Sequence, residues 1–164
     1  MKRNLADASL LGHLLVCAPK LTTLHYDFYL SDDEQRFELG SLKDALVGIK
    51  DTLQHLVIYF APNSNRSPVV KAHSRLGSLK LFECLRSLEI APEILFGTKQ
   101  EGDTTDLRYL VPDALERLVF RGDFELPGYE NYRWPSSEIS RALEEWRDVA
   151  PNNTRVAKLD SRLD

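Results

Sequence analysis

The sequence predicts an α/β fold, a short and irregular solenoid in which parallel strands line the concave face while helices and turns lie outside. Three observations support this prediction. One short motif occurs four times at a nearly constant interval, its hydrophobic period changes from helical to extended within each copy, and helical or turn-like segments precede the copies. With 164 residues, the chain has the length of one such domain, spanning 1–164.

The motif is Leu-x-x-Leu-x-apolar. Its copies read LTTLHY, LQHLVI, LRSLEI and LERLVF, and they begin at Leu21, Leu53, Leu85 and Leu115. The first leucines are therefore 32, 32 and 30 residues apart. The string LGSLK also occurs twice, at 39–43 and 76–80. One Leu-x-x-Leu is common by chance, whereas four evenly spaced copies with the same extension indicate a duplicated unit, the leucine-rich repeat.

Each copy predicts a turn that leads into a short strand. The first leucine enters the core from the turn, and the second leucine and the next apolar residue alternate into it along the strand. A helix through LTTLHYDFYL is the rival interpretation, but its β-branched and aromatic residues favour a strand. Strands are expected near 21–28, 53–60, 85–91 and 115–121, stacked in parallel because one repeat cannot bury its leucines alone.

Helices are expected before the first two copies and near the end of the chain. In MKRNLADASLLGHLLVCAP, the leucines at Leu5, Leu10, Leu11, Leu14 and Leu15 fall on one helical face, which predicts an amphipathic helix that packs on its own domain. The helix preceding the second copy is LGSLKDALVGIKDT.

The C-terminal helix is expected over 137–149, with Ser136 or Ser137 as N-cap and with Ile139, Leu143 and Trp146 on one face. A last, degraded strand follows in NTRVAKLDSRL, where Val156 and Leu159 are the ladder pair. Segments 61–74, 97–106 and 122–135 are expected to be loops, and the aromatic residues of the last one suggest that it folds back on the core.

Composition excludes several classes of function. The net charge is −4 and no run of Lys and Arg occurs, which weighs against nucleic acid and anionic membranes as partners. No apolar run approaches the roughly 20 residues of a membrane-spanning helix. Cys17 and Cys84 lie in apolar stretches, and we expect them to be buried thiols in a reducing compartment. These features predict an intracellular protein, cytoplasmic or nuclear.

Catalytic motifs are missing from the sequence. It contains no G-x-S-x-G, no glycine-rich phosphate loop, no H-E-x-x-H and no spaced Cys/His ligand set. The acidic run at 32–34 has the character of a solvated loop. The sequence therefore predicts no enzyme, no metal and no cofactor.

Strand alternation predicts which side chains lie on the concave face. Concave faces of solenoids are the usual contact surfaces, although the same positions could equally be solvated strand residues with no partner. The candidates are Thr23, His25, Asp27, His55, Val57, Tyr59, Ser87, Glu89, Arg117, Val119 and Arg121, with Ala91 at the end of the third strand.

Two pairs among these candidates suggest chemistry. His25 and His55 are expected in equivalent positions on neighbouring strands, about 5 Å apart, but without a third ligand of fixed spacing a metal site is not predicted. Arg117 and Arg121 could bind a carboxylate or phosphate of a partner. They could also pair with Glu89, Glu116 or Glu125, which is the favoured interpretation.

Four stretches carry a family resemblance. LLVCAPKLTTLHYDFY, LGSLKLFECLRSLEIAPEILFG, VPDALERLVFRGDF and LEEWRDVAPN resemble the repeat region of fungal leucine-rich-repeat proteins of the F-box-like type, over roughly residues 10–155. The resemblance implies partner recognition, with the repeats selecting the substrate of a ubiquitin ligase. Nothing before Leu10 is long enough for an F-box, so it implies contact with the ligase adaptor only if an F-box lies upstream.

The leading hypothesis is therefore a protein-interaction module that recognises a protein partner. The alternative is a structural or capping fragment of a longer solenoid with no partner of its own, which predicts an exposed apolar end. An enzyme with an unrecognised site is the distant third.

Overall fold

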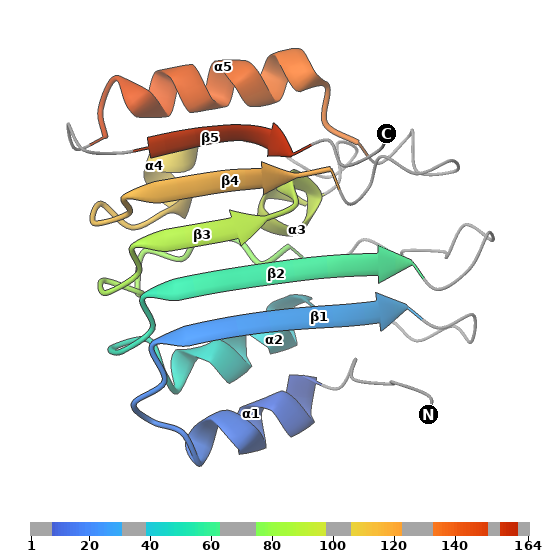
Figure 1. The fold of residues 1–164 in the computed structure, drawn as a ribbon, viewed down its shortest axis with the longest axis vertical. Coiled ribbons are helices and arrows are strands. Elements are labelled where there is room, and N and C mark those ends of the chain that lie inside the picture. Colours follow the sequence, from blue (N-terminus) through green and yellow to red (C-terminus); the bar gives the residue numbers. More distant parts are fainter. Residues whose placement is uncertain are drawn as a thin grey trace.

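The fold is built on one parallel sheet with strand order β1-β2-β3-β4-β5 (Figure 1). The computed structural model describes residues 8–30, 39–62, 75–97, 106–122, 133–150 and 155–160. The strands are β1 (Thr23–Leu30), β2 (His55–Pro62), β3 (Ser87–Ile90), β4 (Arg117–Arg121) and β5 (Arg155–Asp160). The first four lie where the repeats place them, and β5 lies in the degraded copy. The expected α/β class is confirmed.

Five helices accompany the sheet in the described residues. They are α1 (Ala8–Val16), α2 (Leu39–Val47), α3 (Pro92–Phe96), α4 (Leu107–Leu110) and α5 (Ser136–Arg147). Figure 1 shows α2, α3 and α4 behind the sheet, α1 beyond β1 and α5 beyond β5. Helices lie between β1 and β2, between β3 and β4 and between β4 and β5, whereas no described helix lies between β2 and β3.

The register between neighbouring copies is set just before each strand. In each of the first three copies, the residue after the first leucine has a backbone carbonyl that accepts hydrogen bonds from two successive backbone N–H groups of the next copy. The pairs are Thr22 with Gln54 and His55, Gln54 with Arg86 and Ser87, and Arg86 with Glu116 and Arg117, at 2.8 to 3.0 Å. The same contact recurs three times, so the motif fixes the alignment of the strands as well as their existence.

The apolar positions of the motif form the core behind the sheet. The second leucines of the inner copies, Leu56, Leu88 and Leu118, are at most 1% exposed. The apolar residues two positions later are buried in every copy. Leu21 and Leu24 of the first copy are only half-buried, because β1 is the last strand at its edge of the sheet. The alternation predicted from the sequence thus puts the leucines inside.

Helix α1 buries only half of the apolar face that the sequence predicts. Leu11 and Leu15 are buried, whereas Leu10 is 46% and Leu14 56% exposed. Leu5 lies outside the described residues. A Cβ added at Gly12 would lie 3.6 Å from the Cβ of Ala45, so α1 approaches α2 closely on one side. The predicted packing of this helix on the domain is confirmed for two of its four described leucines; α1 stands at the end of the stack (Figure 1), and among the described elements its main neighbour is α2.

Helix α5 has the predicted apolar face. Ile139, Leu143 and Trp146 are buried. The helix begins at Ser136 rather than 137, and no side chain caps it. The predicted serine cap is wrong because the carbonyl of Pro135 occupies the N-cap position and accepts from the N–H groups of the first turn.

Most of the three predicted loops lies outside the described residues, as do 32–34 and Glu125. Trp134, which is described, is buried. Its indole N–H donates to the carbonyl of Gly97 at 2.8 Å, and its ring meets that of Phe96 edge-on with centroids 5.6 Å apart. The chain therefore returns to the core just before α5, as its aromatic content suggests.

Candidate functional surface

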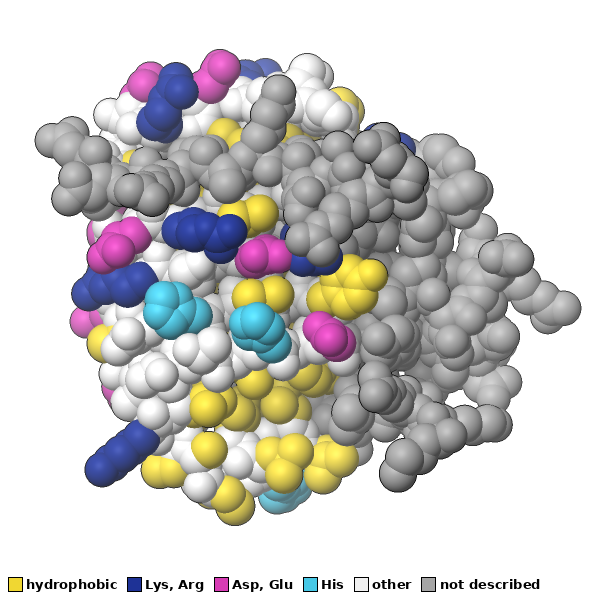
Figure 2. Space-filling view, in the orientation of Figure 1, with side chains coloured by type: hydrophobic (Ala, Val, Ile, Leu, Met, Phe, Trp, Pro, Cys, Tyr) yellow, Lys and Arg dark blue, Asp and Glu magenta, His cyan; other side chains and the backbone are white. Residues whose placement is uncertain are grey.

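The candidate functional surface is the face of the sheet turned away from α2, α3 and α4, which we call the open face. Figure 2 shows this side of the molecule, with histidine, basic and acidic side chains gathered over the strands. Ten of the eleven contact residues predicted from the sequence are exposed or half-buried on it: Thr23, His25, Asp27, His55, Val57, Tyr59, Ser87, Glu89, Arg117 and Arg121.

Val119 and Ala91 depart from this prediction. Val119 alternates onto the open face but is 4% exposed, and it does not belong to the buried cluster behind the sheet. It lies between β3 and β5, paired with Glu89 and Ala157, so strands flank it on both sides. Ala91 is fully buried at the start of α3. Neither side chain offers a contact surface, and both predictions are wrong.

The pairing of the strands arranges the remaining side chains in rows that cross the sheet. Thr23 pairs with His55, His55 with Ser87, and Ser87 with Arg117. We call these four residues the first row.

A second row follows two residues further along each strand. His25 pairs with Val57, and Val57 pairs with Glu89. Beyond it, Asp27 pairs with Tyr59.

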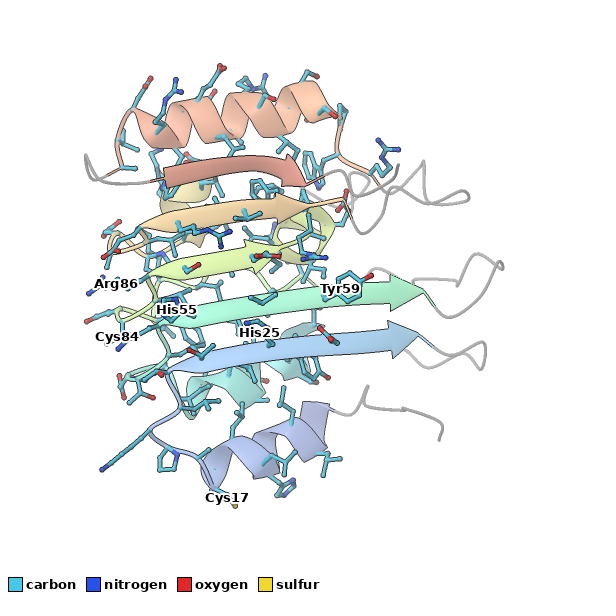
Figure 3. The ribbon with its side chains drawn as sticks, in the orientation of Figure 1. Cys17, His25, His55, Tyr59, Cys84 and Arg86 are labelled. Carbon is cyan, nitrogen blue, oxygen red and sulfur yellow. The ribbon has the colours of Figure 1, made fainter. Side chains whose placement is uncertain are left out.

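The two histidines belong to different rows. His55 lies opposite Thr23, and His25 lies opposite Val57, so the expected equivalence of His25 and His55 is wrong. The reason is their position in the motif: His25 comes four residues after the first leucine of its copy and His55 only two. Figure 3 shows them diagonally placed on β1 and β2. The described residues contain no group of three or more ligands that could hold a metal ion.

An ion network lies over β3 and β4. The Glu89 carboxylate pairs with the guanidinium of Arg121 and, at 3.6 Å, with that of Arg117. The side chains of Glu89 and Arg121 are only 22% and 21% exposed, which makes theirs the more shielded contact. Of the carboxylates that the favoured interpretation offered to these arginines, Glu89 is the one that both contact.

Arg121 also stacks on an aromatic ring. Its guanidinium carbon lies 4.6 Å from the centroid of Tyr59, a cation–π distance. Tyr59 therefore supports the ion network from β2, where Figure 3 shows its ring on the open side of the sheet. The sequence places both residues on this face but does not reveal their contact, because it depends on side-chain reach across β3.

Sequence reasoning misses Arg86. It precedes β3 in the turn of the motif, where strand alternation makes no prediction. Its Nη1 donates to the carbonyl of Ala114 at 2.9 Å, and its Nε lies 3.7 Å from Oε1 of Glu116. Arg86 directly follows the first leucine of its copy, as Thr22 and Gln54 do in theirs. This shared position in the motif could have identified it.

The cysteines are not the buried thiols that the sequence predicts. Both are free; Cys17 is exposed and Cys84 half-buried. The Cys84 thiol donates to the carbonyl of Asp51 at 3.1 Å, in the turn before β2. Both residues lie in turns at the edge of the apolar segments rather than inside them, so the expectation of burial is wrong.

Comparisons with known proteins give no relative from which a function could be transferred. No family model, no curated protein and no solved structure matches the chain. Within the residues that the structure describes, no helix is both long and apolar enough to cross a membrane.

Proposed function

We propose that the chain is a short, irregular leucine-rich-repeat solenoid and that its open face recognises a protein partner. The observation that carries the proposal is a sheet face on which polar, aromatic and charged side chains stand in register on successive parallel strands. The spacing of 32, 32 and 30 residues between copies and the recurrent carbonyl contact between them support the solenoid.

The resemblance to fungal F-box-like proteins makes selection of a ubiquitin-ligase substrate the specific form of this proposal. Contact with the ligase adaptor belongs to it only where an F-box lies upstream. The same proposal takes the protein to be intracellular and non-enzymatic, with neither nucleic acid nor membrane as its partner.

Affinity capture with the full chain tests the proposal. The bait is the wild type or His25→Ala/His55→Ala; both imidazoles are exposed and make no hydrogen bond to a described residue. The control is Arg141→Ala/Arg147→Ala, on the exposed side of α5. We expect partners captured by the wild type and the control to be lost from the histidine variant. Identical partners for all three baits would contradict a role of the open face.

A second candidate function, a capping or structural segment of a longer solenoid, is favoured by the exposed apolar side chains at the α1 end. Leu14 is 56% and Val16 74% exposed on α1, and Val47 on α2 is 38% exposed. This candidate predicts self-association or incomplete folding of the isolated chain. A monomer in sedimentation experiments that unfolds in one cooperative transition would contradict it.

A further inference from the structure

We propose that the first row, Thr23, His55, Ser87 and Arg117, binds an acidic, carboxylate-bearing segment of the protein partner. The inference rests on the proposed function and names the chemistry that the open face would recognise. It is argued from the geometry of the row, the hydrogen-bonding groups in it and the local balance of charge.

The row takes one side chain from each of four neighbouring strands, in register across the sheet. Neighbouring strands lie about 4.8 Å apart, so His55 on β2 and Arg117 on β4 stand roughly 10 Å from each other. Thr23, His55 and Arg117 are exposed, and Ser87 is half-buried. The row therefore presents accessible side chains that an extended peptide lying across the strands could contact in succession.

Each member of the row can donate a hydrogen bond, and none is a carboxylate. Arg117 is only loosely engaged. Its Nη1 lies 3.4 Å from the Ser87 hydroxyl and 3.6 Å from Glu89, and its side chain is 47% exposed. Among the described residues, Nε and Nη2 of Arg117 have no partner, which leaves two N–H directions for an incoming carboxylate.

The described charged side chains that pair with or next to Arg117 carry a net positive charge, although the chain is acidic overall. Glu89 has Arg121 as its closer partner, and Glu116 pairs with Arg86. Among these described side chains, three guanidinium groups face two carboxylates, which leaves one positive charge in excess, on Arg117. Asp27 lies beyond the second row, on β1.

One excess charge favours a peptide over a nucleic acid. Binding to a phosphate backbone rests on many basic side chains, and the open face supplies few. A guanidinium flanked by imidazole and hydroxyl donors suits an isolated carboxylate, which Arg binds through two parallel hydrogen bonds.

A phage-displayed library of random dodecapeptides, selected on the immobilised full chain, tests the inference. We expect the selected sequences to be enriched in Asp and Glu over the input library. Replacing their acidic residues by Asn and Gln should weaken binding in fluorescence anisotropy by about tenfold, and higher salt should weaken it as well.

Variants then locate the site. Arg117→Gln should weaken the selected peptides by about tenfold, whereas the matched charge change Arg147→Gln on α5 should leave affinity within about twofold. Circular dichroism checks that each variant folds. If Arg117→Gln does not fold, His55→Ala/Ser87→Ala should give the same loss.

The outcomes separate this inference from the function on which it rests. Peptides that bind the open face without acidic enrichment, or equal loss from both arginine variants, would overturn the inference and leave the proposed function standing. Competition by a single-stranded oligonucleotide as strong as that of the peptide would also overturn it. Failure to select any sequence above background would count against both.

Discussion

Glu89 is the residue on which two arginines of the open face converge. Because its contact with Arg121 is largely shielded from water, we expect Glu89→Gln to lower the free energy of unfolding by about 1–2 kcal/mol, between the values for exposed and buried ion pairs. Urea denaturation measures this loss. Asp113→Asn is the control, since Asp113 pairs with Lys80 at a side chain that is 95% exposed. A loss as large in the control would contradict the role of burial.

Asp106 makes stability depend on pH at the start of α4. Its carboxylate accepts from the side chain of Arg108 and, at 3.0 Å, from its backbone N–H; these hydrogen bonds lower the pKa of Asp106. Folding therefore favours the ionised form, so its stabilisation is present at neutral pH and is lost as the pH falls below about 4. Asp106→Asn keeps a capping oxygen. We expect it to reduce the difference in urea midpoint between pH 7 and pH 3, and an unchanged difference would contradict this assignment.

Among the helices and turns, two glycines differ in whether alanine can replace them. Gly12 is inside α1, and a Cβ there would make an ordinary contact with Ala45 at 3.6 Å. Gly12→Ala should therefore stabilise the protein by about 0.5–1 kcal/mol through helix propensity. Gly77 has φ +67°, where an L side chain is strained, so Gly77→Ala should destabilise by about 1 kcal/mol. Thermal unfolding measures the melting temperature of both variants. A shift in the same direction for both would contradict these expectations.

The elements that the sequence predicts are those with local signals. The strands follow from the motif, since each copy carries its own turn and alternation. Helices α3 and α4 carry only a start signal, Pro92 in the first turn of α3 and the Asp106 cap of α4, and at about one turn each they are too short to show a hydrophobic period. In α3 the buried Glu93 carboxylate accepts from the backbone N–H of Trp134, 41 residues away. No pattern inside a window of helical length reveals that partner.

For the whole molecule, alternation predicts the open face but not the environment of each residue on it. The burial of Val119 depends on the strands around it, and the stacking of Arg121 on Tyr59 depends on reach across β3. The positions of the two histidines, in contrast, could have been predicted. Counting from the first leucine of each copy places His25 and His55 in different rows. The path of the backbone can therefore be predicted from the sequence more completely than the contacts of the side chains.

Stability should be greatest in the middle of the strand stack. Leu88 on β3 is fully buried with strands on both sides, whereas Leu24 on the edge strand β1 is half-buried. We expect Leu88→Ala to cost about 3–4 kcal/mol and Leu24→Ala about 1–2 kcal/mol in urea denaturation, since the inner cavity cannot be relieved by solvent or by movement of an edge.

Hydrogen exchange extends the test from single residues to the stack. Each copy contacts its neighbours, so the amides of β3 have support from two sides and those of β1 from one. We expect slower exchange in β3 than in β1, and we expect Leu24→Ala to accelerate exchange in β1 before it affects β4. Equal losses of stability for the two alanine variants, together with uniform exchange across the sheet, would contradict this expectation. The sheet would then unfold as one unit, and the position of a strand in the stack would not affect its stability.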